Sequence, residues 1–93
     1  MRMIDRSSAF KRDYKREAKG QHRTSLDDLL MPVLLALATD KTLDARYRDH
    51  DLSGNWAGYR ECHVKPDFLL IYRKPDSTTL RLARLGSHSE LFG

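Results

Sequence analysis

The sequence predicts an α+β fold in which two N-terminal helices pack on a small antiparallel β-sheet. Apolar residues recur at helical spacing in residues 8–37, whereas short apolar runs separated by tight turns fill residues 59–85. The chain has 93 residues, enough to bury one modest core, so we expect a single domain over residues 1–93.

The N-terminal region should contain a short edge strand and then a helix. The strand is expected at residues 2–5, and Ser7 or Ser8 can cap a helix that ends at Gly20. The buried face of this helix is marked by residues that recur every four positions: Phe10, Tyr14 and Ala18. A basic stripe runs beside that face: Arg12, Lys15, Arg16 and Lys19. Such a stripe is either a solvated surface or a contact for an RNA backbone or a partner protein.

The second helix is expected to begin at Ser25, which together with Asp28 resembles a capping box with a shorter acid. Apolar residues then repeat at helical spacing: Leu26, Leu29, Leu30, Val33, Leu34 and Leu37. Pro32 interrupts this run, and a proline inside a helix removes a backbone donor and clashes with the previous turn, at a cost of roughly 3 kcal/mol. We therefore expect a kink, with Pro32 facing outward because it lies off the leucine stripe.

The remainder of the chain indicates a loop followed by a sheet. Residues 39–58 are polar and carry turn formers at positions 53–55, so we expect a structured loop there. Three strands joined by tight turns follow as an antiparallel meander: residues 59–65, 68–74 and 79–85. Residues 68–72 are apolar at every position, which indicates a central strand covered on both faces.

Composition restricts the setting in which the chain works. Lysine and arginine outnumber aspartate and glutamate by 17 to 13, a net charge of +4 that suits an anionic partner without proving one. Cys62 is the only cysteine, so an internal disulfide is excluded and a reducing compartment is indicated. No apolar run approaches the ~20 residues that span a bilayer, and the N-terminus lacks the apolar segment of a signal peptide. We expect a cytoplasmic protein without a membrane partner.

The residues that carry chemistry lie in the second half of the chain. The candidate catalytic set consists of three histidines, an aspartate and an arginine: His50, His63, Asp67, Arg84 and His88. Imidazoles titrate near pH ~6.5, so a pair of them can supply a general base and a general acid near neutral pH. An arginine can neutralise the charge that develops on a phosphoryl group. RNA fits this set because its 2'-hydroxyl is a built-in nucleophile, and its cleavage requires neither a metal nor another cofactor.

Three further residues are expected to hold the substrate: Phe92, Arg60 and Lys65. An aromatic ring near the C-terminus can stack on an unpaired base, worth about 1–3 kcal/mol, although Phe92 can also cap the core. For Arg60 two roles remain possible, binding an RNA backbone or stabilising the sheet.

Each catalytic candidate also has a structural alternative. Asp67 can merely stabilise its own turn, Arg84 can form an ion pair with an aspartate, and His50 can be an ordinary loop residue. The three histidines with Asp67 also resemble an open zinc site. Each histidine lies on a separate segment beside cations that repel the ion, so we predict no metal site.

Four blocks of the sequence resemble the YafQ branch of the RelE/ParE toxin superfamily. They are YRDHDLSGNW at residues 47–56, GYRECHVKPD at 58–67, LIY at 70–72 and LGSHSELFG at 85–93. The resemblance covers almost the whole chain, and it implies two helices packed on an antiparallel sheet. It further implies a metal-independent endoribonuclease that cuts mRNA in the ribosomal A site and thereby inhibits translation. The implied partners are a cognate antitoxin, the ribosome and mRNA, and Phe92 is implied to act in the active site.

Two other functions are compatible with this fold. A ParE-like relative would be a non-enzymatic toxin that binds and poisons DNA gyrase, but binding alone has no need of the histidine–aspartate set. A degenerate antitoxin-binding protein whose catalysis has lapsed is the other, and the intact motifs argue against it.

Overall fold

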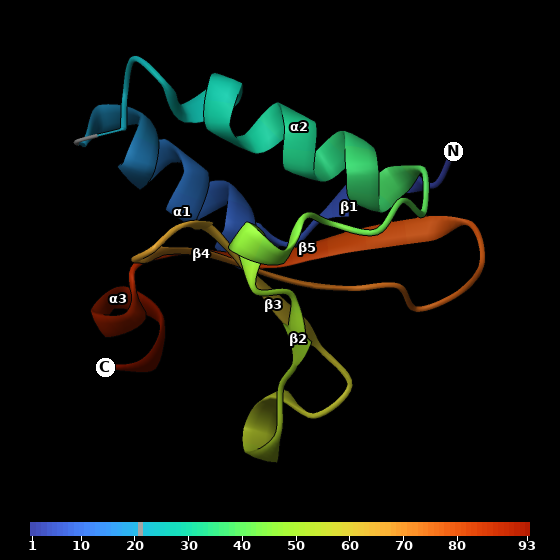
Figure 1. Ribbon diagram of the computed structural model, residues 1–93. Coiled ribbons are helices and arrows are strands. Elements are labelled where there is room, and N and C mark those ends of the chain that lie inside the picture. The colour runs from blue at the N-terminus through green and yellow to red at the C-terminus, as the bar shows by residue number, and fades with distance from the viewer. Residues whose placement is uncertain (21) are drawn as a thin grey trace.

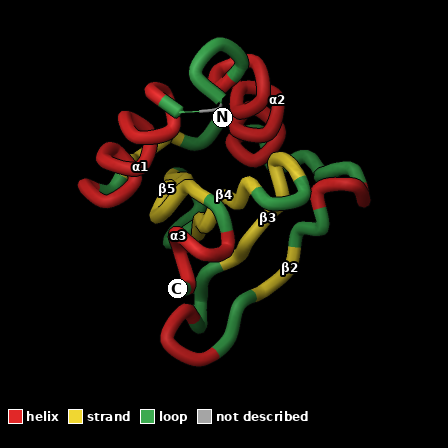
Figure 2. Tube along the Cα trace, turned by 90° about the vertical axis from the view of Figure 1, so that its left-hand side faces the viewer, coloured by secondary structure: helices red, strands yellow, loops and turns green. Residues whose placement is uncertain are grey.

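The computed structural model describes residues 1–20 and 22–93 as helices packed against a five-stranded sheet (Figure 1). Helices α1 (Ser8–Lys19) and α2 (Leu26–Ala38) cover one face of the sheet. The short helix α3 (His88–Phe92) lies on the other side, as Figure 2 also shows. The predicted α+β class is therefore confirmed.

The sheet has the strand order β1-β5-β4-β3-β2. Its strands are β1 (Met3–Arg6), β2 (His50–Asp51), β3 (Arg60–Lys65), β4 (Phe68–Arg73) and β5 (Thr79–Gly86). Strands β3 to β5 pair antiparallel as predicted, and β2, which lies in the predicted loop, pairs antiparallel with β3. Strand β1 pairs parallel with β5, so the sheet is mixed. No tight turn links β1 to β5 in the sequence, so the direction of this edge strand could not be inferred.

The loop predicted at residues 39–58 is structured. It contains the 3₁₀ turns η1 (Ala45–Tyr47) and η2 (Gly54–Trp56) and the short strand β2 between them. Arg48 has a left-handed backbone with φ of 49°, and this turn directs the chain from η1 into β2. The loop thereby brings His50 to the edge of the sheet.

Helix α1 is positioned by Ser7, which caps it and also contacts the sheet. The Ser7 hydroxyl accepts a hydrogen bond from the Phe10 N–H (2.9 Å) and donates one to the carbonyl of Ala83 on β5 (2.8 Å). Phe10 is buried as predicted, but the other buried side chains of the helix are two carboxylates, Asp13 and Glu17. The hydrophobic pattern gave no indication of these two.

Helix α2 continues through Pro32, which is exposed as predicted. Its buried side chains form one stripe against the sheet: Leu26, Leu30, Val33, Leu37 and Ala38. Ser25 stands at the N-cap without a side-chain capping bond among the described residues, so the capping-box prediction is wrong. The helix therefore depends on burial of its apolar stripe, each such side chain contributing about 1.5–3 kcal/mol.

Strand β4 is the centre of the core. Residues 68–72 are all buried, with alternate side chains in the helix-side cluster and in a second cluster that includes Leu91 of α3. This arrangement confirms the prediction of a strand covered on both faces. In the described part of the chain, no helix has the length and apolarity needed to cross a membrane.

Candidate active site

Three histidines form a row across one end of the sheet. The ring centroids of His50 and His63 are 6.1 Å apart, and those of His63 and His88 are 5.6 Å apart. Phe92 extends the row, with its ring centroid 6.5 Å from that of His88. Four of the residues that the sequence singled out, from segments as far apart as residues 50 and 92, thus lie side by side.

Strand register explains this convergence. His50 on β2 pairs with Glu61 on β3, and His63 lies two residues further along β3, on the same face as Glu61. His63 pairs with Leu69 of β4, which in turn pairs with Gly86 at the end of β5. The chain leaves β5 at that point and places His88 beside His63.

Asp67 holds His88 through its backbone and its ring. The carboxylate oxygen Oδ1 of Asp67 accepts a hydrogen bond from the His88 N–H (2.9 Å) and lies 2.7 Å from His88 Nδ1. The backbone hydrogen bond first, and then the ring contact, hold the pKa of the Asp67 carboxyl below its usual value. An Nδ1–H directed at this carboxylate leaves Nε2 of His88 as the nitrogen that can exchange a proton with a substrate.

Glu61 is a member of the site that the sequence analysis missed. Its side chain is 6% exposed, and its Oε1 lies 3.2 Å from Nε2 of His63 and 3.7 Å from Nε2 of His50. Nδ1 of His63 lies 3.1 Å from the carbonyl of Pro66, so an acceptor faces each nitrogen of that ring. Both nitrogens can donate at once only in the imidazolium form. Side chains two positions apart on a strand point to the same face, so the place of Glu61 two residues before His63 could have identified it.

Arg84 is bound to an aspartate, the structural alternative that the sequence left open. Its Nε and Nη2 donate to the two carboxylate oxygens of Asp13 at 2.7 and 3.1 Å, and Asp13 also accepts from the Leu85 N–H (3.0 Å). Burial alone raises the pKa of the Asp13 carboxyl, but the hydrogen bonds from Arg84 and Leu85 outweigh it and hold this pKa below its usual value. The structure therefore joins Arg84 to α1, and a catalytic role for it stays a prediction.

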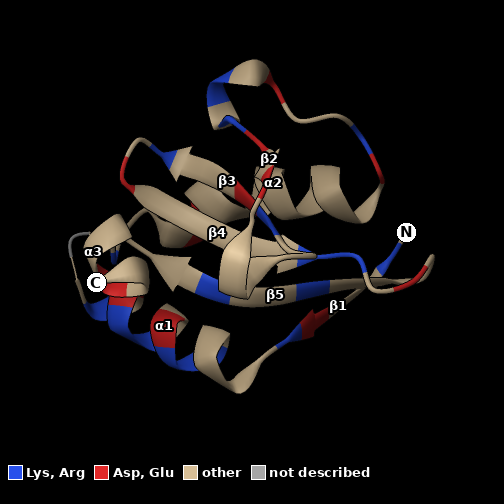
Figure 3. Ribbon diagram, turned by 90° about the horizontal axis from the view of Figure 1, so that it is seen from below, with Lys and Arg blue, Asp and Glu red and all other residues tan. Residues whose placement is uncertain are grey.

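Arg16 connects α1 to the helix that carries His88. It donates to Asp13, Glu17 and the carbonyl of Leu85, and its Nε forms an ion pair with Oε2 of Glu90 on α3 at 3.0 Å. Glu90 in turn completes a capping box with Ser87 at the start of α3. Figure 3 shows basic and acidic positions following one another along α1. Arg16, which belongs to the predicted basic stripe, is part of this ion-pair network.

Arg60 points to the opposite face of β3 from Glu61 and His63. Its guanidinium pairs with Asp49 at 3.1 Å and Asp51 at 2.5 Å, and the hydroxyl of Tyr72 donates to Asp49 at 2.5 Å. The hydrogen bond to Asp49 raises the pKa of Arg60. These contacts support the alternative in which Arg60 stabilises the sheet. They do not support the predicted contact of Arg60 with substrate.

Cys62, between Glu61 and His63 in sequence, points into the helix-side core. Burial raises the pKa of its thiol to about 12, so this side chain is a packed hydrophobe and not a nucleophile at neutral pH.

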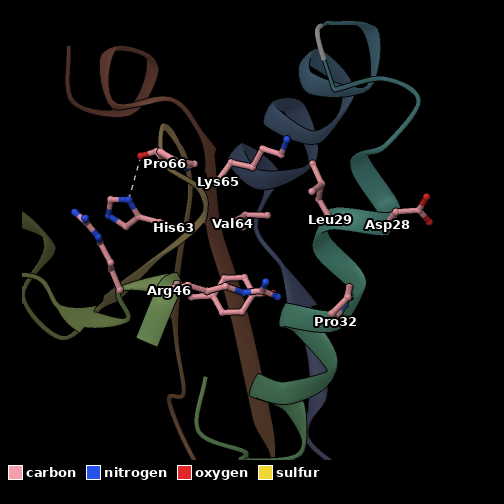
Figure 4. A pocket seen from close by; sticks show the side chains of 10 residues that line it. Asp28, Leu29, Pro32, Arg46, His63, Val64, Lys65 and Pro66 are labelled. Atoms are coloured by element: carbon pink, nitrogen blue, oxygen red, sulfur yellow. Dashed lines mark hydrogen bonds between the residues drawn. The ribbon is translucent and has the colours of Figure 1, made fainter. Parts of the chain in front are cut away.

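A cationic groove adjoins the histidine row. It has a volume of about 780 Å³, and His63 and Lys65 line it together with Arg46 and Arg48, two cations that the sequence analysis did not select (Figure 4). Lys65, predicted to hold substrate, is exposed here.

Three residues of the site have the donor atoms to hold a metal ion. One nitrogen each from His50 and His63 and one oxygen from Glu61 lie within 4.8 Å of one another. This set differs from the zinc alternative considered above, because Glu61 takes the place of Asp67 and His88. Imidazole nitrogens and a carboxylate are suitable ligands for zinc or copper.

Comparison with known proteins identifies the family. Residues 2–93 match the model of the family described as "Bacterial toxin of type II toxin-antitoxin system, YafQ". The chain is 39% identical over 93 residues to the mRNA interferase toxin YafQ of Escherichia coli K12, covering 98% of this chain and all of that protein.

Solved structures have the same fold. YafQ in the E. coli DinJ–YafQ complex superimposes with a TM-score of 0.83 at 37% identity, covering all of both chains. A metal-bound toxin from Helicobacter pylori gives 0.81 at 43% identity, covering 99% of this chain and all of that one. The chain therefore belongs to the YafQ family of type II toxin-antitoxin toxins.

Proposed function

We propose that this chain is an endoribonuclease toxin that cuts mRNA in the ribosomal A site and thereby inhibits translation, in the cytoplasm of the cell that makes it. The row of His50, His63 and His88, with Asp67 bonded to His88, is the observation that carries the proposal. The E. coli relative is an mRNA interferase by name, which supports the same activity here.

The reaction is an in-line attack of a ribose 2'-oxygen on the adjacent phosphate. One histidine of the pair His63 and His88, or Asp67, removes the 2'-proton, and a second histidine protonates the departing 5'-oxygen. To exchange a proton with the substrate, His63 must first turn one ring nitrogen away from Glu61 or the Pro66 carbonyl. The products are a 2',3'-cyclic phosphate and a 5'-hydroxyl. Which ring acts as base depends on the side of the phosphate on which each one lies. Glu61 lies against Nε2 of His63, and His50 lies on the other side of the same carboxylate oxygen.

Negative charge on the phosphorane is neutralised by cations beside His63. Lys65 and Arg48 line the groove that includes His63, and neither forms an ion pair among the described residues. Arg84, the cation predicted from sequence, would first have to leave Asp13. Arg84 therefore stays a candidate for stabilising the phosphorane, on the condition that it exchanges Asp13 for the substrate phosphate.

A cognate antitoxin binds and silences the toxin in this proposal, as DinJ forms a complex with YafQ of E. coli. The acid–base groups present suffice for the chemistry, so the proposed cleavage proceeds without a metal.

Primer extension on an mRNA in a translation extract tests the proposal. We expect discrete cuts with the wild-type chain that depend on translation, persist after chelation with magnesium restored for the ribosomes, and disappear with His88→Ala. Loss of cutting on chelation, despite the added magnesium, would indicate metal chemistry. Absence of cuts from a folded wild-type chain would favour the gyrase-binding alternative.

A further inference from the structure

The groove beside His63 has an apolar floor. It runs between the first half of α2 and the end of β3, and Leu29, Pro32 and Val64 contribute to its lining (Figure 4). Val64 is buried and belongs to the helix-side core, so this floor is continuous with the rigid centre of the protein. His63 lines the same groove, which places one end of it at the histidine row.

The rim of the groove is cationic. Arg46, Arg48 and Lys65 line it with a single carboxylate, Asp28, which extends away from His63 in Figure 4. All three cations are exposed, and over residues 1–20 and 22–93 none of them forms an ion pair with a carboxylate. Their charge is available to an anionic ligand.

The guanidinium of Arg46 lies over the ring of Tyr47 at this rim. The guanidinium carbon of Arg46 lies 4.8 Å from the centroid of the Tyr47 ring, and its Nη2 donates to the Tyr47 hydroxyl at 2.9 Å. Stacked guanidinium and aromatic planes are the surfaces on which unpaired RNA bases stack.

We propose that this groove binds the nucleotide of the RNA substrate next to the scissile phosphate. Its base lies over the apolar floor against Arg46 and Tyr47, and Lys65 and Arg48 contact its phosphate. The inference rests on the proposed function, since it assigns the groove to the same substrate. An RNA strand whose phosphate lies between His63 and His88 continues past His63, and the groove begins there. This continuity favours RNA over an acidic peptide, which the cationic rim alone would also suit.

Fluorescence anisotropy with a labelled RNA hexamer tests the proposal. Every ribose of the hexamer carries a 2'-O-methyl group, which removes the nucleophile and prevents cleavage. We expect Arg46→Ala to weaken binding about fivefold or more, the loss typical of one stacked base. Lys65→Ala should weaken binding and lower the slope of log affinity against log salt by about one, the effect of one lost phosphate contact.

Lys41→Ala is the matched control. Lys41 is an exposed lysine that lines a second groove, together with Arg60 and Tyr72, and its loss changes the net charge by the same amount as Lys65→Ala. We expect near wild-type binding from this variant. Equal losses in Lys41→Ala and Lys65→Ala would mean non-specific attraction and would overturn the proposal. Thermal unfolding of each variant checks that the fold is retained.

The outcomes separate this inference from the proposed function. If the hexamer binds in an Arg46-dependent way but mRNA is not cleaved, RNA binding by the groove would be supported and the proposed nuclease function would be overturned. If cleavage depends on the histidines but Arg46→Ala and Lys65→Ala change neither hexamer binding nor KM, RNA binding by the groove would be overturned and the nuclease function would stand. Competition by an octaglutamate peptide, with no binding of the hexamer itself, would assign the groove to a protein partner and also overturn the proposal.

Discussion

Asp67 and His88 are joined by two contacts that end on the same carboxylate oxygen, one from the backbone N–H of His88 and one from its ring Nδ1. This oxygen sets both the start of α3 and the direction of the imidazole. Asp67 belongs to the β3–β4 turn, so the strand turn and the C-terminal helix are mechanically linked through a candidate catalytic residue.

Removing the charge of Asp67 should alter the pH dependence of cleavage. The pKa of Asp67 is held below its usual value, so the carboxylate is ionised near neutral pH and its negative charge lies against Nδ1 of His88. In Asp67→Asn we expect slower cleavage and a pH–rate profile in which one limb moves to lower pH: the alkaline limb if His88 is the general acid, and the acidic limb if it is the base. Single-turnover cleavage between pH 5 and pH 9 measures both effects.

His88→Ala provides the reference for that experiment. It should reduce cleavage by about 10²–10⁴-fold, the usual contribution of a general acid or base, and by more than Asp67→Asn does. A wild-type profile in Asp67→Asn would show that Asp67 only supports its turn.

Asp13 should contribute stability that disappears in acid. Its side chain is 4% exposed and ion-paired with Arg84 and Arg16, and its pKa lies below 3.8. The stabilisation is therefore fully present above the unfolded-state pKa and is lost as the pH falls through the lowered folded-state value. We expect Asp13→Asn to lower the free energy of unfolding by about 3 kcal/mol at pH 7, and by less at low pH.

Urea unfolding at neutral and acidic pH measures this difference. Asp5→Asn is the control, because Asp5 is half-exposed in its ion pair with Arg81 and such surface pairs contribute only about 0–1 kcal/mol. Equal and pH-independent losses in the two variants would contradict the assignment.

Gly86 should be sensitive to substitution because the side chains of Arg16 and Glu90 occupy the space that a Cβ atom would need. A Cβ at this position would lie 2.7 Å from Nη2 of Arg16 and 3.0 Å from Oε1 of Glu90. We expect Gly86→Ala to displace the Arg16–Glu90 ion pair and with it the anchoring of α3, so that cleavage falls more than stability does. Cleavage assays and thermal unfolding on the same samples compare the two losses.

A double-mutant cycle identifies the cause of that effect. If the clash with Arg16 is responsible, Gly86→Ala should cost less in an Arg16→Ala background, with a coupling of about 0.5–3 kcal/mol. If the losses of the two single variants simply add in the double variant, the clash with Arg16 is not the cause of the Gly86→Ala effect.

Zinc should inhibit cleavage without being needed for it. A metal held by His50, Glu61 and His63 would occupy a nitrogen of His63, one of the two rings that the proposed mechanism uses for proton transfer. We expect micromolar to millimolar zinc to inhibit the wild-type chain and the chelator to restore activity. Isothermal titration calorimetry of zinc into wild type and Glu61→Gln should show weaker binding in the variant, and equal binding would exclude Glu61 as a ligand.

The sequence by itself determined the two long helices, the three-strand meander and most of the candidate residues, but not the short elements α3 and β2. Helical periodicity identified α1 and α2, and continuous apolarity identified β4 as the buried centre, because these patterns report which side chains must leave water. His50, His63, Asp67 and His88 were selected from the chemistry of imidazole together with the sequence blocks around them, which resemble the toxin family, since only the imidazole group titrates near neutral pH without a large pKa shift.

Tertiary structure alone decided which polar residues act together. Glu61 joins the site because it lies opposite His50 on a neighbouring strand, and Arg84 pairs with Asp13 because α1 packs against β5. The polarity of a side chain is a local property, whereas its partner depends on strand register and helix placement, which are set by contacts between residues far apart in the chain. The parallel direction of β1 and the groove beside His63 follow from the same long-range packing.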